Sequence, residues 1–223
     1  MKKEQDKGCR QNSDCWYNEV CNLDCNSCIR YLEMKYLVDN SGIPKSQQYP
    51  KALEADIDYD KFIRLADIKS SIIDFVNSQE NLLIVSEYTG NGKTSWAIKL
   101  LLKYFDEIWA GNGFKVRGLF VHIPTLLLKL KNFNEPLSEE YKHNLMECDL
   151  VIWDDIASTD ISNYDYSQLL SYIDYRLLAN KSNIYTGNCT TSKALKETLG
   201  ERLASRIWHT SEIIEFKGKD RRG

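Results

Sequence analysis

The distribution of apolar residues predicts alternating strands and helices from about residue 61 onward. Short, mostly apolar runs bounded by polar residues are typical of strands buried on both faces, and they occur at residues 82–85, 118–123, 150–153, 183–186 and 212–216. Apolar residues at helical spacing predict helices at residues 65–76, 94–105 and 166–178. Strands that alternate with helices indicate an α/β fold with an open central sheet and helices on both of its faces.

The first 60 residues lack this alternation. Residues 1–35 are rich in cysteine and have few apolar side chains, whereas residues 36–60 contain Gly42, Pro44 and Pro50 together with several acidic residues. We therefore expect three parts: a small module at 1–35, a linker with little regular structure at 36–60, and an α/β domain at 61–223.

A phosphate-binding pattern follows the first strand of this domain. Residues 87–94 read Glu-Tyr-Thr-Gly-Asn-Gly-Lys-Thr between a predicted strand and a predicted helix, close to the P-loop pattern G-x-x-x-x-G-K-[ST]. Glu87 replaces the first glycine, at the end of the strand and away from the expected phosphates. A chance glycine–lysine turn is the simpler alternative. The expected nucleotide-binding residues are Thr89, Gly90, Asn91, Gly92, Lys93, Thr94 and Ser95.

Each of these side chains has an expected role. Gly90 and Gly92 allow backbone N–H groups to turn toward phosphate oxygens, and the start of the next helix adds further N–H groups. Lys93 is expected at the β- and γ-phosphates, and the Thr94 hydroxyl at Mg²⁺. Ser95 is expected near the α-phosphate.

Two carboxylates end a later apolar run. Asp154 and Asp155 follow residues 150–153, at the strand end where open α/β sheets bind ligands. Asp154 is expected to hold Mg²⁺, and Asp155 to orient or deprotonate the attacking water. ATPases of this type mostly have Glu at the second position, so we expect slow hydrolysis. A solvated acidic turn is the alternative reading.

The order of the runs predicts the sheet. One strand lies between the P-loop and the acidic strand in sequence, which is typical of ATPases with strand order 5-1-4-3-2. The inserted strand is then 183–186, and Asn188 beyond it is the candidate sensor of the γ-phosphate; a turn role beside Gly187 is the alternative. Arg202 and Arg206 are four residues apart and share a helix face. They are candidates for an arginine finger that contacts a neighbour's γ-phosphate; the alternative is a solvated helix face.

The ordered motifs resemble the AAA+ ATPases of the DnaC-type replicative helicase loaders, especially phage and Gram-positive versions. The matching stretches are TGNGKTSWA, DLVIWDDI, IYTGN, LGERLASRI and FKGKDRR. The resemblance implies an AAA+ core without a C-terminal lid, in a ring or spiral homo-oligomer with ATP at subunit interfaces. It also implies Arg206 as the better finger candidate, Arg202 as the second, and Arg222 as a second sensor.

The same resemblance implies partners. One partner is a hexameric DnaB-type replicative helicase, which the N-terminal module binds. The other is single-stranded DNA, which the core binds. The net charge of −3 gives no global attraction to nucleic acid, so DNA contacts must come from a local basic patch. Two rival functions remain: an IstB-type ATPase that regulates transposition, and an adaptor that binds nucleotide without hydrolysing it.

Five of the seven cysteines lie in the first 28 residues. Because no apolar run is long enough for a membrane span or a secretory signal, we expect a cytoplasmic protein with reduced thiols. The cluster then favours Zn²⁺, bound by four of Cys9, Cys15, Cys21, Cys25 and Cys28, with Cys28 the expected extra. An iron–sulfur cluster and unligated cysteines are the alternatives. His122, His143 and His209 show no metal spacing and are interpreted as structural.

Overall fold

Five parallel strands form the central sheet. The computed structural model describes residues 29–48, 59–131, 137–157 and 163–217. The strands are β1 (Asn81–Val85), β2 (Gly118–His122), β3 (Leu150–Asp154), β4 (Ser182–Gly187) and β5 (Glu212–Glu215). They lie side by side in the order β2-β3-β4-β1-β5. The predicted strand order is confirmed, with β4 inserted between the P-loop strand and the acidic strand.

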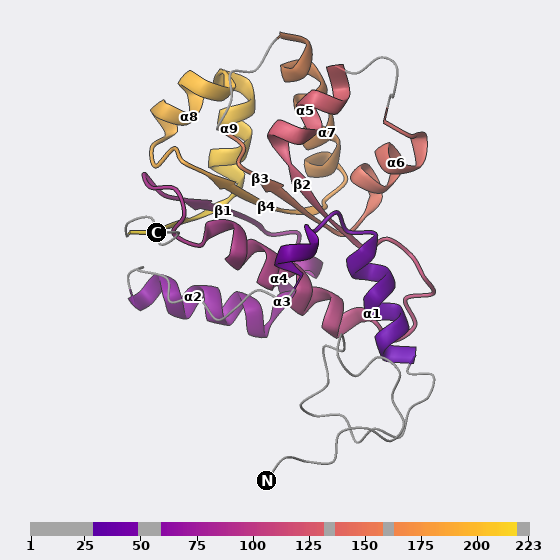
Figure 1. Cartoon of the computed structure of the whole chain (residues 1–223). Helices are drawn as coiled ribbons and strands as arrows, with labels where there is room; N and C mark the ends of the chain where they lie inside the picture. The colour runs from indigo at the N-terminus through magenta and orange to yellow at the C-terminus, as the bar shows by residue number, and fades with distance from the viewer. Residues whose placement is uncertain (1–28, 49–58, 132–136, 158–162, 218–223) are drawn as a thin grey trace.

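Helices cover both faces of this sheet (Figure 1). One face carries α1 (Ile29–Asp39), α2 (Tyr59–Ser70), α3 (Ile72–Asn77) and α4 (Lys93–Ile108). The other carries α5 (Ile123–Lys131), α6 (Glu139–Glu147), α7 (Asn163–Leu178), α8 (Ser192–Leu199) and α9 (Glu201–Thr210). A short 3₁₀ helix, η2 (Lys45–Gln47), follows α1.

The central parts of the strands are mostly apolar because successive residues face two cores on opposite sides of the sheet. In β1, Leu82 and Ile84 pack in the core under α4, whereas Leu83 and Val85 pack in the core under α7 to α9. All five residues of β1 are buried. This two-sided burial explains why the sequence shows continuous apolar runs instead of alternation.

Two predicted boundaries differ from the structure. The helix predicted at 65–76 is two helices, α2 and α3, separated at Ser71, whose hydroxyl donates to the backbone oxygen of Asp67. Helix α1 crosses the boundary expected between residues 35 and 36. It has regular structure where a linker was expected, because Leu37 and Val38 are buried in the core under α4.

Candidate functional site

The P-loop takes its shape from two glycines at its tip. Gly90 and Gly92 have φ values of +69° and +99°, a region that residues with a Cβ rarely adopt. Gly92 precedes the first turn of α4, and its carbonyl accepts from the Trp96 N–H at 2.9 Å. The loop therefore leads directly into a helix N-terminus, where unpaired N–H groups favour an anion.

Lys93 is held at the base of this loop. It is only 8% exposed, and its Nζ donates to the Tyr88 carbonyl at 2.8 Å and to Asn91 Oδ1 at 3.2 Å. Asn91 in turn donates to the hydroxyl of Ser86, the first residue after β1. These contacts place an ammonium group beside the backbone N–H groups of the loop. Such an arrangement suits the phosphates of a nucleoside triphosphate.

Asp154 ends β3 beside the start of α4. One of its oxygens, Oδ1, accepts from Thr94 Oγ1 at 2.7 Å and from Thr186 Oγ1 at 2.7 Å. The carboxylate is 5% exposed, and burial raises its pKa, while the two hydroxyl donors act against that rise. Strand β3 and the P-loop helix therefore meet at a single buried carboxylate oxygen.

This pair fits a magnesium ion. Hard oxygen donors are what Mg²⁺ prefers, and it is commonly bound by one or two protein oxygens together with substrate phosphates and waters. Thr94 and Asp154 supply such oxygens. Among the described residues, no group of three or more His, Cys, Asp or Glu side chains gathers to hold a metal by itself.

Asp155 has an unusual backbone. Its φ is +61°, and its N–H donates to Thr186 Oγ1 at 3.0 Å. A left-handed conformation costs a residue with a side chain about 1 kcal/mol, so the hydrogen bond from the neighbouring strand helps to hold it. Asp155 also lines the same cavity as Asp154.

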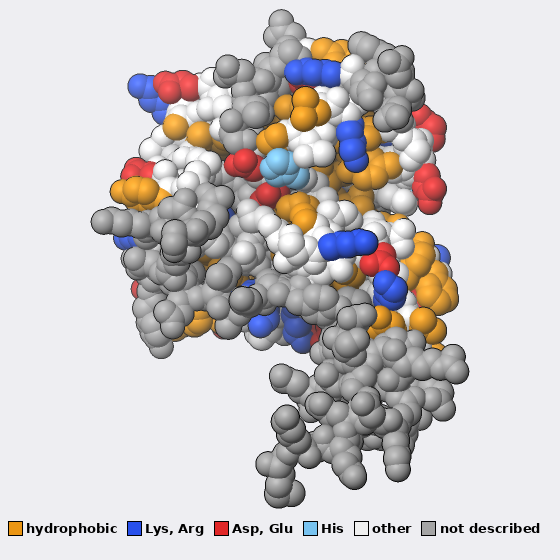
Figure 2. Space-filling model, in the orientation of Figure 1, with side chains coloured by type: hydrophobic (Ala, Val, Ile, Leu, Met, Phe, Trp, Pro, Cys, Tyr) orange, Lys and Arg blue, Asp and Glu red, His pale blue; other side chains and the backbone are white. Residues whose placement is uncertain are grey.

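A cavity of about 770 Å³ connects these groups. Its lining includes Thr89 to Ser95 of the P-loop, both acidic residues of the β3 end, and Asn188 beyond β4. On the face shown in Figure 2, a histidine and acidic side chains lie next to one another. The structure thus brings together the P-loop, the acidic pair and the sensor candidate that the sequence places far apart.

Two residues at this site were not expected from the sequence. Thr186 bonds to both acidic residues, although the sequence analysis favoured Asn188 as the polar group of this strand. His122 was interpreted as structural, but it lines the cavity, and its Nδ1 lies 2.8 Å from Thr125 Oγ1. Both could have been identified from the sequence, because Thr186 and His122 are polar residues at the ends of predicted strands.

The arginines of α9 lie elsewhere. Arg206 Nε is 2.5 Å from Asp174 Oδ1 on α7, and Arg202 lies 3.4 Å from Oδ2 of the same carboxylate. Neither arginine is among the described residues that line the cavity. Within one chain, both arginines therefore face Asp174 and not the P-loop.

Several predicted ligands lie outside the described residues. They are Arg222 of the C-terminal basic stretch and the five N-terminal cysteines, Cys9, Cys15, Cys21, Cys25 and Cys28. The zinc prediction therefore has no structural support. Within the described part, Cys148 is buried and Cys189 is partly buried, consistent with packing roles. No helix of the described segments combines the length and apolar character needed to cross a membrane.

Several solved structures of replication proteins have the same fold. The crystal structure of the DnaC helicase loader superposes with a TM-score of 0.63 at 22% identity, covering 78% of this chain and all of that chain. The DnaI structure gives 0.61 at 20% identity, covering 81% and 94%. AMPPCP-bound DnaA from Aquifex aeolicus gives 0.55 at 13% identity, covering 82% and 50%. At these identities, the similarity establishes the P-loop AAA+ fold.

The sequence itself places the chain in a family. A search of the curated proteins finds no match. The sequence model of the IstB-like ATP binding proteins matches residues 45–223, a range that contains the P-loop, the acidic pair and both α9 arginines. The chain therefore belongs to the IstB-like ATP-binding protein family.

Proposed function

We propose that this protein is a Mg²⁺-dependent ATPase that loads a hexameric, DnaB-type replicative helicase onto single-stranded DNA in the cytoplasm. The observation that carries the ATPase part is the hydrogen bond between Thr94 and Asp154, which joins the P-loop to an acidic strand end around one cavity. The loader part is supported by the resemblance of the ordered motifs to helicase loaders and by the similarity of the fold to DnaC and DnaI.

In this proposal, the cavity residues have separate roles. Lys93 and the P-loop backbone bind the phosphates, while Thr94 and Asp154 hold Mg²⁺, which neutralises charge on the β- and γ-phosphates when bound. Asp155 orients the attacking water, and Asn188 contacts the γ-phosphate or that water. Hydrolysis is slow because an Asp side chain is one methylene shorter than Glu. Turnover is also sensitive to DNA or a partner.

The active assembly is a homo-oligomer, a ring or a spiral. Arg206 is exposed enough to reach a neighbouring subunit, with 36% of its side chain accessible, and it leaves Asp174 to do so. A guanidinium supplied by the neighbour stabilises charge in the transition state. Arg202, which is 64% exposed, is the second candidate, and Arg222 reads the nucleotide within its own subunit.

The N-terminal cysteines bind Zn²⁺ and fold the module that grips the helicase. Four thiolates at short separations surround one tetrahedral ion. Metal analysis of the purified chain should find about one zinc per subunit, and a chelator should release it together with helicase binding. A protein that purifies without zinc or iron, yet still captures the helicase, contradicts this assignment.

Lys93→Ala tests the ATPase, with Lys103→Ala as its control. Lys103 lies on the same helix but pairs with Glu107 away from the cavity. Lys93→Ala should lose ATP binding or turnover, because it removes the ammonium at the P-loop, whereas Lys103→Ala should keep both. Fluorescent-nucleotide binding and phosphate release measure the two steps. Equal behaviour of the two variants would falsify the site assignment.

Capture of a hexameric helicase tests the loader function. The full chain with ATP should bind the helicase and increase its residence on single-stranded DNA, measured by pull-down and by strand unwinding. The match to the IstB-like family favours a second candidate, an ATPase that serves a transposase. ATP-dependent binding of a transposase without binding of a helicase would establish that alternative. Undetectable turnover with DNA and partner both present would instead favour a non-hydrolysing adaptor.

A further inference from the structure

A segment before the P-loop domain forms part of the cavity wall. We call residues 41–48, between α1 and the end of the described N-terminal part, the strap. The family match begins at residue 45, so α1 and the first half of the strap precede it. The strap runs from α1 to the cavity, and its Gly42, Pro44 and Gln47 line that cavity together with Lys93 and Asp154.

Helix α1 anchors one end of the strap to α4. Arg30 pairs with Asp106 at 2.6 Å, and its guanidinium lies over the Trp109 ring at 5.6 Å. The buried carboxylate of Glu33 accepts from the backbone N–H of Phe114 at 3.3 Å, in the connection between α4 and β2. Figure 1 shows α1 beside the C-terminal half of α4. Helix α1 is therefore joined to the helix that begins at the P-loop.

The strap itself pairs with the edge strand β2. The Phe120 N–H donates to the Ser41 carbonyl at 2.6 Å, and the buried Ser41 hydroxyl donates to the Val38 carbonyl and accepts from the Ile43 N–H. Gly42 has φ +77°, and a Cβ there would lie 2.8 Å from the Phe120 carbonyl oxygen. A side chain at Gly42 is therefore excluded both by backbone conformation and by space.

Gln47 is the strap residue suited to contact a ligand. Its N–H donates to the Pro44 carbonyl at 2.8 Å within η2, which fixes its backbone next to the cavity. Its side-chain oxygen is buried and has no hydrogen-bond partner among the described residues. Leaving a buried carbonyl oxygen unpaired is costly. A carboxamide oxygen only accepts, so this oxygen gains by meeting a donor, such as a water held by a bound ligand.

The sheet order indicates which part of a nucleotide the strap faces. The P-loop follows β1, Asp154 ends β3, and β2 with the strap lies on the far side of β3. A triphosphate bound at the P-loop and bridged by its metal to Asp154 extends from β1 toward β3. Its γ-phosphate is therefore the nucleotide group directed toward the β2 side of the cavity.

We propose that the strap is a wall of the cavity that responds to the γ-phosphate, and that Gln47 makes the contact. Its side-chain oxygen accepts from a water that also donates to a γ-phosphate oxygen. ADP lacks that phosphate, so the strap and α1 are held more tightly with ATP than with ADP. This rests on the proposed nucleotide binding and extends it to the N-terminal part of the chain.

Hydrogen–deuterium exchange on the full chain tests the response. The samples are the protein alone, with Mg²⁺ and ADP, and with Mg²⁺ and a non-hydrolysable ATP analogue. Both nucleotides should slow exchange in P-loop peptides. Only the triphosphate should slow exchange in peptides from residues 29–48, by about fivefold or more, because a closed strap opens less often.

Gln47→Ala and Gln48→Ala separate a ligand contact from a packing role. The two residues are adjacent, but Gln48 does not line the cavity in the described structure. Gln47→Ala should remove the difference between triphosphate and diphosphate in the strap. It should also weaken binding of the ATP analogue about fivefold, the scale of one lost hydrogen bond, and leave ADP affinity unchanged. Gln48→Ala should behave as the wild type.

Gly42→Ala, with Gly111→Ala as control, tests the strap by a second route. Both glycines have φ near +75°, but no described atom lies within 4 Å of a Cβ added at Gly111. Gly42→Ala should raise exchange in residues 29–48 without nucleotide and abolish their response to the triphosphate, whereas Gly111→Ala should preserve that response.

The outcomes separate this inference from the proposed function. If the triphosphate protects P-loop peptides but not the strap, or if Gln47→Ala keeps the full response, the strap inference is wrong and nucleotide binding stands. If neither nucleotide protects the P-loop, the proposed function fails, and the strap inference fails with it.

Discussion

One carboxylate oxygen receives hydrogen bonds from two different structural elements. Asp154 Oδ1 accepts from Thr94 on the P-loop helix and from Thr186 on β4, and Thr186 also accepts from the Asp155 N–H. A single threonine hydroxyl therefore positions both acidic residues. Thr186 acts through these neighbours, so it is a positioning residue of the proposed reaction.

Replacing this hydroxyl should slow hydrolysis. Thr186→Val keeps the β-branched shape but removes the donor to Asp154 and the acceptor for Asp155, so we expect turnover to fall about tenfold, which corresponds to ~1.4 kcal/mol. Thr186→Ser restores the hydroxyl and should recover most of the rate. Steady-state phosphate release measures the effect, and ADP affinity should stay constant. Wild-type turnover in Thr186→Val would show that Asp155 needs no such support.

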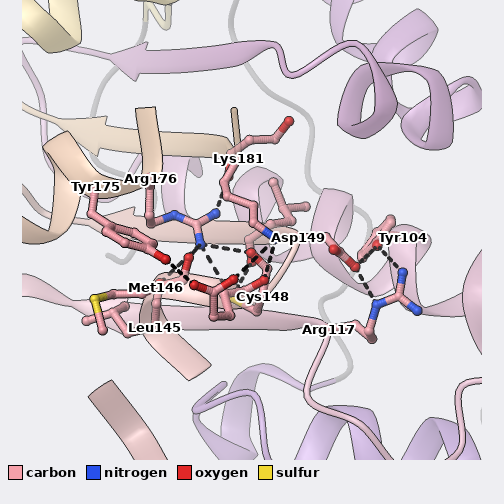
Figure 3. A network of polar contacts seen from close by, with 12 residues as sticks. Tyr104, Arg117, Leu145, Met146, Cys148, Asp149, Tyr175, Arg176 and Lys181 are labelled. Carbon is pink, nitrogen blue, oxygen red and sulfur yellow. Dashed lines mark hydrogen bonds and ion pairs between the residues drawn. The ribbon is translucent and has the colours of Figure 1, made fainter. Parts of the chain in front are cut away.

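At the scale of elements, a buried arginine ties one helix end to the sheet. Figure 3 shows the Arg176 guanidinium directed at backbone oxygens. It donates to the Leu145 and Cys148 carbonyls at the end of α6, to the Ser182 carbonyl at the start of β4, and to Asn183 Oδ1. The last carbonyls of a helix lack partners within it. Arg176 supplies them from α7, although burial lowers its pKa.

Removing this guanidinium should destabilise the fold. Arg176→Met fills a similar volume but leaves several buried carbonyls unpaired, so we expect a loss of ~3 kcal/mol in the free energy of unfolding. Arg64→Met is the control, because Arg64 forms half-exposed ion pairs with Glu80 and Glu212 that contribute at most ~1 kcal/mol. Urea unfolding followed by circular dichroism measures both. Similar losses in the two variants would contradict the special role of Arg176.

At the scale of the whole molecule, the cavity and the arginines of α9 lie apart within one chain. Within one chain, Arg206 pairs with Asp174 and stays away from the P-loop. The proposed assembly exchanges this ion pair for a contact with the neighbour's nucleotide. Arg202 also lies 3.4 Å from Oδ2 of Asp174, so this partly buried carboxylate keeps a cationic neighbour when Arg206 turns away.

Arg206→Ala should keep ATP binding and lose most turnover. Asp174→Asn is the matched control: it breaks the same ion pair but leaves the guanidinium, so its turnover should be preserved. Mixing Arg206→Ala with Lys93→Ala subunits should restore part of the rate, because each mixed interface can combine an intact P-loop with an intact arginine. Normal turnover of Arg206→Ala alone, or equal loss in Asp174→Asn, would contradict a role in trans.

The sequence by itself determined the sheet and the motif order. Apolar runs located all five strands, since strands buried on both faces are mostly apolar, and the order of the runs relative to the P-loop predicted the position of β4. It also identified Lys93, Thr94, Asp154 and Asp155 as candidates, because a glycine-rich loop before a helix and carboxylates after an apolar strand are local patterns. Their proximity followed from parallel strands ending at one edge.

Only the tertiary structure decided which other groups meet there. Thr186 and His122 enter the site through strand register, which sequence spacing does not encode, and the strap enters it because Ser41 pairs with an edge strand almost eighty residues later in the chain. Residues 36–60 were predicted to be a linker because glycine and prolines interrupt them, yet Val38 and Ile43 are buried in the core. The local sequence determines the conformational preference of a segment by itself. Contacts between residues far apart in the sequence form only when the sheet and its helices pack.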